Sequence, residues 1–85
     1  MSKILIYTTA VCPYCIRAKA LLDKKQVRYQ EIKVDTDLAQ REQMQALTGR
    51  RTVPQIIIND QPIGGCDDLY ALEHAGKLDA LLQSH

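Results

Sequence analysis

Short apolar runs alternate along the chain with amphipathic segments, and this alternation predicts strands and helices in turn. Residues Ile4–Thr8 are mostly apolar without a polar face, which is typical of a strand covered on both sides. From Pro13 to about Lys25 the apolar positions recur at helical spacing. Pro13 suits the first helical position because its missing N–H costs nothing there. The chain is therefore expected to begin with a strand followed by a helix.

The next part of the chain predicts a second strand and a second helix. The strand is expected over Val27–Val34, but its apolar positions change parity after Tyr29, so we expect a bulge or an early end. The helix is expected to take its N-cap from Asp35–Asp37. Gly49 fits the left-handed position that ends such a helix.

The last third predicts a hairpin followed by helix. A third strand is expected over Gln55–Asn59, with a tight turn into a short fourth strand, and Pro62 places that strand at a sheet edge. Gly64 and Gly65 interrupt the sheet, and Cys66, Asp67 or Asp68 is expected to cap the next helix, which ends at Gly76 before a final helical turn around Leu78–Leu82. The expected fold is α/β, with a mixed four-stranded sheet and helices on both faces.

Length and composition limit the classes of protein that fit. The 85 residues, of which 46% are hydrophobic, indicate a single domain over residues 1–85 with no room for a second. Eleven basic against ten acidic side chains argue against a nucleic-acid binder or a reader of anionic membranes. There is no apolar stretch near the ~20 residues that span a bilayer and no signal-peptide core. We therefore expect a cytoplasmic protein without a membrane partner.

Three cysteines are too few and odd in number for a disulfide framework, so redox or metal chemistry is indicated. Cys12-Pro13-Tyr14-Cys15 follows a predicted strand and opens a helix, which is the setting of a redox pair. Free N–H groups and the helix dipole should stabilise the Cys12 thiolate, so its pKa should fall below the ~8.5 of free cysteine. Cys15 lies one turn inside the helix. Cys12 is thus the expected attacking sulfur and Cys15 the resolving one.

Two alternatives to a redox pair stay open at this point. A zinc site needs about four ligands, and the pair supplies only two. Cys66 with His74 would complete the set, but their spacing of eight follows no finger pattern. The second alternative is a purely structural pair. A proline between the two cysteines is unhelpful for wrapping a metal, so no metal site is expected and redox chemistry is the favoured interpretation.

Two further segments carry possible binding groups. Thr52-Val53-Pro54 precedes the third strand; an ordinary trans proline is the more frequent case, whereas a cis bond would turn the Val53 backbone outward to pair with a peptide. Gly64–Asp68 joins a helix N-terminus to two carboxylates, which suits a ligand with both a carboxylate and an ammonium group, although an ordinary N-cap explains it equally well. Arg41, Arg50 and Arg51 are by themselves more often solvated than functional.

These three motifs, in this order, resemble the glutaredoxin family, in its dithiol class with Cys-Pro-Tyr-Cys. The run Asp67–Leu72 and the length are most similar to the bacterial glutaredoxin 3 type. The resemblance covers essentially the whole chain. It implies a thioredoxin fold, a cis bond before Pro54, and glutathione as the thiol cofactor. It also implies reduction of protein–glutathione mixed disulfides through Cys12 and of protein disulfides through Cys12 and Cys15.

The resemblance further implies roles for individual residues and partners. Positions expected to contact glutathione are Tyr14, Thr52, Val53 and Pro54 along its cysteinyl part, Gly65, Cys66, Asp67 and Asp68 at its γ-glutamyl end, and Arg41 at its glycine carboxylate. The implied partners are glutathionylated proteins and disulfide-containing reductases, with the protein a monomer. Thr9 departs from the family, because a basic residue is usual at that position.

Three other functions fit parts of the pattern. A thioredoxin-like electron carrier shares the fold, but it is expected to have Gly-Pro between its cysteines and a tryptophan beside them, and this chain has no tryptophan. An iron–sulfur carrier would use Cys12 and glutathione from two chains, and Pro13 disfavours it by stiffening the loop. A non-catalytic adaptor would use the groove only to display a peptide.

Overall fold

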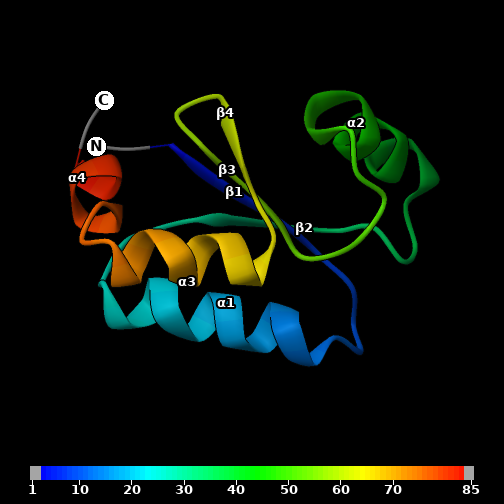
Figure 1. Cartoon of the computed structure of the whole chain (residues 1–85). Helices are drawn as coiled ribbons and strands as arrows, with labels where there is room; N and C mark the ends of the chain where they lie inside the picture. Colours follow the sequence, from blue (N-terminus) through cyan, green and yellow to red (C-terminus); the bar gives the residue numbers. More distant parts are fainter. Residues whose placement is uncertain (1–2, 84–85) are drawn as a thin grey trace.

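The computed structural model describes residues 3–83, and its strands and helices follow the predicted order. The elements are β1 (Ile4–Thr8), α1 (Pro13–Lys24), β2 (Gln30–Lys33), α2 (Leu38–Thr48), β3 (Gln55–Ile58), β4 (Gln61–Gly64), α3 (Cys66–His74) and α4 (Leu78–Gln83). The strands form one sheet in the order β2-β1-β3-β4 (Figure 1). Since β1 runs parallel to β2 and antiparallel to β3, the predicted mixed four-stranded sheet is confirmed.

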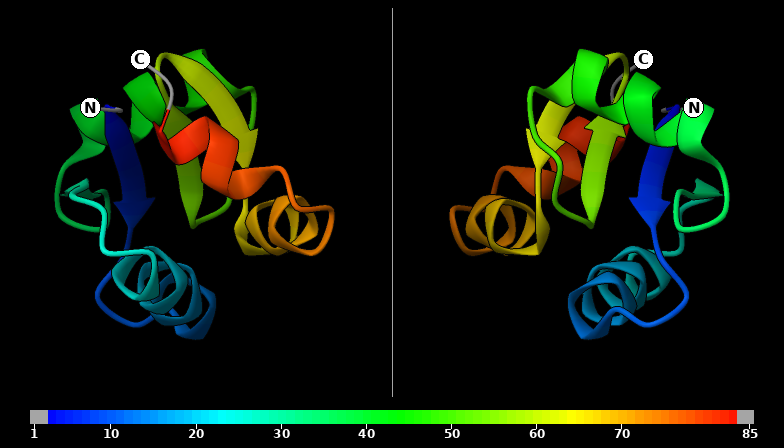
Figure 2. Two further views of the ribbon diagram at one scale, coloured as in Figure 1. Left: turned by 90° about the vertical axis from the view of Figure 1, so that its left-hand side faces the viewer. Right: turned by 90° about the vertical axis from the view of Figure 1, so that its right-hand side faces the viewer.

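Helices cover both faces of this sheet, and each face has its own apolar cluster. Figures 1 and 2 show α1 and α3 side by side on one face, with α2 apart from them on the other. Strand β3 serves both clusters: Ile56 and Ile58 join Leu22 and Leu69 on the α1–α3 face, whereas Ile57 joins Met44 on the α2 face. Burial on two faces explains why the central strands are continuously apolar.

The predicted second strand is wrong over its first three residues, because β2 begins only at Gln30. The chain turns sharply at Gln26, which has a positive φ of 59°. Val27 and Tyr29 then pack against the core on the α1–α3 face instead of joining the sheet. The Tyr29 hydroxyl donates to Asp23 of α1 at 3.0 Å, which holds this segment against the helix. The change of parity after Tyr29 therefore marks the late start of the strand.

The hairpin is as expected except that β3 ends one residue early, at Ile58. Asn59 and Asp60 both have positive φ, 52° and 68°, and form the two-residue turn into β4. Such a turn matches the right-handed twist of paired strands. Strand β4 contains Pro62 and lies at the edge of the sheet, as predicted. Within residues 3–83, no helix has the length and apolar character needed to cross a membrane.

Candidate active site

Cys12 occupies the point where the loop after β1 enters α1. Its backbone is extended (φ −153°, ψ 97°) and it caps the helix, with the Cys12 sulfur accepting from the Cys15 backbone N–H at 3.1 Å. The two cysteines form a disulfide. Cys12 keeps 8% of its surface exposed and Cys15 only 1%, so an incoming sulfur can reach Cys12 alone. The geometry thus assigns the two sulfurs the unequal accessibility that the spacing predicted.

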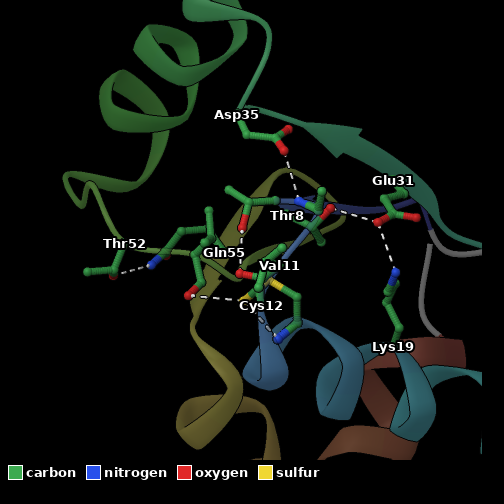
Figure 3. Close-up of a disulfide and its surroundings, with 12 residues drawn as sticks. Thr8, Val11, Cys12, Lys19, Glu31, Asp35, Thr52 and Gln55 are labelled. Atoms are coloured by element: carbon green, nitrogen blue, oxygen red, sulfur yellow. Dashed lines mark hydrogen bonds and ion pairs between the residues drawn. A yellow bond between two sulfur atoms is a disulfide. The ribbon is translucent and has the colours of Figure 1, made fainter.

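Two carboxylates hold the start of this loop (Figure 3). The backbone N–H of Ala10 donates to Asp35 at 2.9 Å. The buried Thr8 hydroxyl donates to Glu31 at 2.7 Å, and Lys19 pairs with the same carboxylate at 3.0 Å. The Thr8 hydrogen bond, with a further contribution from Lys19, lowers the pKa of Glu31. The end of β1 is therefore tied to β2 through Glu31, and the loop that carries Cys12 is tied through Asp35 to the segment after β2.

A groove of about 200 Å³ opens beside Tyr14, between the loop preceding β3 and the start of α3. Its walls come from three parts of the chain that are distant in sequence. The lining residues are Tyr14, Arg50, Thr52, Val53, Pro54, Gln55, Gly65, Cys66, Asp67 and Asp68. The fold thereby brings together all the predicted glutathione-contact positions except Arg41.

The Val53–Pro54 peptide bond is cis, as the family resemblance implied and against the more frequent trans case. The Val53 carbonyl oxygen lies 3.9 Å from the Cys12 sulfur, so one of the groove-lining residues lies beside the reactive atom. Behind it, the buried Gln55 amide donates to the Thr52 hydroxyl at 3.3 Å. The other end of that amide, Oε1, is buried without a hydrogen-bond partner among the described residues.

The opposite end of the groove is the N-terminus of α3. The predicted cap at Cys66, Asp67 or Asp68 is wrong by at least one residue, because Gly65 occupies the N-cap. Asp68 instead reaches back and accepts from the Gly65 N–H at 2.9 Å, while Arg50 pairs with the same carboxylate oxygen at 3.0 Å. The Gly65 hydrogen bond first, and Arg50 second, lower the pKa of Asp68. Asp67 is exposed at the groove.

The residue before the N-cap of α3, Gly64, has no room for a side chain beside the Asp68 carboxylate. Its φ is +119°, and a Cβ there would lie 2.7 Å from the Asp68 carboxyl carbon. A side chain would thus meet both a strained backbone and the carboxylate that caps α3. The sequence signal Gly-Gly followed by two acidic residues therefore reflects one structural unit.

Sequence comparison places the chain among known proteins. The family model described as Glutaredoxin matches residues 4–63. The chain belongs to the glutaredoxin family. It is 57% identical over 83 residues to glutaredoxin 3 of Escherichia coli strain K12, covering 98% of this chain and 100% of that one. It is 56% identical over 84 residues to a glutaredoxin of Pseudomonas aeruginosa, covering 99% and 100%.

Solved glutaredoxin structures share the fold. A buckwheat glutaredoxin–glutathione complex matches with a TM-score of 0.88 and 34% identity, covering 95% of this chain and 76% of that one. A Brucella melitensis glutaredoxin in solution matches with a TM-score of 0.84 and 52% identity, covering 95% and 88%. The thioredoxin fold is confirmed, and the family and the close cysteine pair identify a thiol–disulfide oxidoreductase.

Two of the predicted contact residues of this glutaredoxin, Arg41 and Cys66, are engaged in other contacts or buried. Arg41 lies on α2 outside the groove lining, and its guanidinium donates to the Arg51 carbonyl at 3.2 Å. Cys66 has only 6% of its surface exposed, and burial raises the pKa of its thiol. That is the setting of a packing cysteine. Among the described residues, no three His, Cys, Asp or Glu side chains gather in a way that could hold a metal ion.

Sequence reasoning missed two groove residues. Arg50 was expected to be solvated, yet it pairs with Asp68 across the groove. Gln55 was assigned only to a strand, but its side chain is 1% exposed and supports Thr52. A polar residue in an otherwise apolar central strand was the available signal for Gln55. Arg50 gave none, because its partner lies 18 residues away along the chain.

Proposed function

We propose that the protein is a glutathione-dependent oxidoreductase that reduces protein–glutathione mixed disulfides through Cys12 and protein disulfides through Cys12 and Cys15. The observation that carries this is the position of Cys12 at the N-terminus of α1, where it is the more accessible of the two cysteines and its sulfur lies 3.9 Å from the Val53 carbonyl. The accessible sulfur therefore stands at one end of a groove that ends in a helix N-terminus and a free carboxylate.

For a mixed disulfide between a protein and glutathione, the Cys12 thiolate attacks the glutathionyl sulfur. The bond between the two sulfurs of the substrate breaks, the protein leaves as a thiolate that takes a proton from water, and Cys12 becomes glutathionylated. A second glutathione thiolate then attacks the glutathionyl sulfur and releases oxidised glutathione and the Cys12 thiolate. The Cys15 N–H at 3.1 Å stabilises Cys12 as the leaving group in this second step.

For a protein disulfide, Cys12 attacks one sulfur and forms a mixed disulfide with the protein. The buried Cys15 sulfur then attacks Cys12, which releases the protein as a dithiol and leaves the Cys12–Cys15 disulfide. That disulfide is the oxidised state that the structure contains. Two glutathione molecules reduce it and leave together as oxidised glutathione. The proposed protein partners are accordingly glutathionylated proteins and reductases that carry a disulfide.

Glutathione is the proposed thiol because the groove offers partners for each of its parts. Its cysteinyl part would lie against Tyr14 and the backbone of Thr52–Pro54. The free N–H groups at the start of α3 suit the α-carboxylate of its γ-glutamyl end. Asp67 would hold the ammonium group there, since the Asp68 carboxylate is already bound to Gly65 and Arg50. The buckwheat relative whose structure is described as a glutathione complex supports this proposal.

A glutathione-coupled assay of the wild type, Cys12→Ser and Cys15→Ser tests the proposal on two substrates, a small glutathione mixed disulfide and a protein disulfide. We expect Cys12→Ser to lose both activities. We expect Cys15→Ser to keep the first and to lose the second, because only the second requires a resolving sulfur. Equal loss of both activities in Cys15→Ser would refute the division of roles.

Three further measurements separate the proposal from its rivals. A thioredoxin-like carrier would turn over with a flavoenzyme and slowly with glutathione alone. An adaptor would bind its partner equally well as Cys12→Ser. An iron–sulfur carrier would be coloured after anaerobic purification with glutathione. Turnover with glutathione as the sole reductant, by a colourless protein, is the result that the proposal requires.

A further inference from the structure

Exposed apolar side chains gather around Cys12. In residues 3–83, the large hydrophobic side chains that remain exposed are Val11 (90%), Tyr14 (55%), Ile16 (62%), Leu38 (71%) and Leu47 (49%). Single exposed hydrophobic residues are normal on a protein surface. Here, however, three of the five (Val11, Tyr14 and Ile16) fall within the six residues 11–16, the stretch that contains the one reachable sulfur. The other two lie on α2, apart from α1.

Val11 and Ile16 occupy the two positions of a hydrophobic staple, yet the staple is open. Since Cys12 is the N-cap of α1, Val11 is the residue before the cap and Ile16 is the fourth helical residue. In a closed staple these two side chains pack on each other and fix the entry of the chain into the helix. A Val11 side chain that is 90% exposed makes almost no such contact. Its loop is held instead by Asp35 and Glu31.

Both residues lie close to Cys12 along the chain. Val11 precedes it in the chain, and Figure 3 shows the two side by side. The Ile16 N–H donates to the Cys12 carbonyl at 3.1 Å, which places Ile16 one helical turn further on the same side of α1. The two exposed side chains, named here the Val11–Ile16 patch, therefore come one residue before Cys12 and one helical turn after it.

The patch is separate from the groove. Neither Val11 nor Ile16 lines it, whereas Tyr14 does. A small thiol seated in the groove therefore reaches Cys12 without covering the patch. A peptide joined to Cys12 is in a different position, because a disulfide holds its two Cα atoms about 4.4–6.8 Å apart. The residues beside the peptide cysteine must then lie over the surface next to Cys12.

We propose that the Val11–Ile16 patch is a docking surface for the protein substrate, and that it selects cysteines flanked by apolar residues in an extended segment. This inference rests on the proposed function, because it names the protein substrates that the proposed oxidoreductase prefers. Burial of the two side chains by apolar neighbours stabilises the approach to the mixed disulfide, and small disulfides gain nothing from it.

The test measures the first chemical step alone, in a Cys15→Ser background. Two ten-residue peptides carry a central cysteine as a mixed disulfide with 5-thio-2-nitrobenzoate, one with leucines and one with serines on both sides of the cysteine. The Cys12 thiolate attacks the peptide sulfur, the Cys12–peptide disulfide forms, and coloured thionitrobenzoate leaves with the electron pair. Stopped-flow absorbance gives the second-order rate constant. No glutathione takes part, so the outcome is independent of whether glutathione is the natural reductant.

We expect the leucine peptide to react about tenfold faster than the serine peptide, which corresponds to about 1.4 kcal/mol and to burial of roughly 60 Å² of apolar surface. In the further variant Val11→Ser/Ile16→Ser the ratio should fall to about one. The symmetric small disulfide of thionitrobenzoate should react at the same rate with both proteins. The matched control Leu38→Ser/Leu47→Ser removes two exposed leucines on α2 and should keep the tenfold ratio.

A ratio near one in the starting protein would overturn the proposal, and so would a tenfold ratio that survives the loss of Val11 and Ile16. A fall in the rate with the small disulfide by the same factor would also overturn it, because the patch would then act on Cys12 itself. Loss of the ratio in the α2 control would show that general surface hydrophobicity, and not this patch, selects the peptide.

Discussion

The Asp68 carboxylate is predicted to stabilise the fold rather than to bind the ligand directly, and Asp68→Ala tests this. The substitution removes the acceptor for the Gly65 N–H, which is worth about 1 kcal/mol (range ~0.5–2) at a helix N-terminus. It also removes the pair with Arg50, whose side chains are 54% and 44% exposed, so solvent screening limits that pair to roughly 0–1 kcal/mol. The expected loss is about 1–2 kcal/mol, or about 4–16 °C in thermal midpoint.

Urea unfolding at pH 7 of the wild type, Asp68→Ala and Asp68→Asn measures this, with the Cys12–Cys15 pair in the same redox state throughout. Asp68→Asn keeps an oxygen for the Gly65 N–H and loses only the charge, so it should cost roughly half as much. Asp67→Ala is the matched control. Its exposed carboxylate lies in the first turn of α3 without the Gly65 and Arg50 contacts of Asp68, so its loss should cost only about 0.3–1 kcal/mol of stability through the helix dipole. The same loss should raise the KM for a glutathione mixed disulfide, through a charge-assisted contact worth about 1.5–3 kcal/mol at most.

The pH dependence gives a second measurement. Because the Gly65 hydrogen bond and Arg50 lower the pKa of Asp68, the charged form stabilises the fold. This contribution is complete above the unfolded pKa of about 3.9 and disappears as the pH falls through the lower folded pKa. The gap in unfolding free energy between wild type and Asp68→Ala should therefore narrow below about pH 4. A gap that stays constant from pH 7 to pH 2.5, or no gap at pH 7, would refute the reasoning.

Two other substitutions probe the frame around the site. Gly64→Ala should cost about 1–3 kcal/mol in unfolding free energy, since it adds a Cβ at φ +119° against the Asp68 carboxyl group. The loss should be smaller in the Asp68→Ala background, where that carboxyl group is absent. If the costs of the two substitutions simply add in the double variant, the contact is contradicted. Tyr29→Phe should cost about 1 kcal/mol by removing the bond to Asp23. Burial, followed by that bond, raises the pKa of Tyr29 to about 12. The stabilisation that the Tyr29 hydroxyl provides is therefore complete below pH 10 and is lost between pH 10 and 12. If the difference in unfolding free energy between wild type and Tyr29→Phe stays the same across this range, the assignment is contradicted.

Features encoded within a few neighbouring residues could be predicted from the sequence. Cys12 caps its helix because Pro13 favours the first helical position and disfavours a helical backbone at the residue before it, and the Cys12 sulfur accepts from the N–H three residues on. The edge position of Pro62 follows from its missing donor in the same way. Family resemblance added the cis bond before Pro54, which local statistics disfavour.

The tertiary structure decided which distant groups meet. The position of the Val53 carbonyl beside Cys12, 41 residues away, depends on how β1 and β3 pair. Likewise Arg50 pairs with Asp68 because the fold places the loop before β3 beside the start of α3. Val11 and Ile16 occupy staple positions relative to the Cys12 N-cap, and only their exposed surface in the folded chain shows that the staple is open. Local periodicity sets each element, whereas long-range contacts depend on strand register and loop path, which no short stretch of sequence contains.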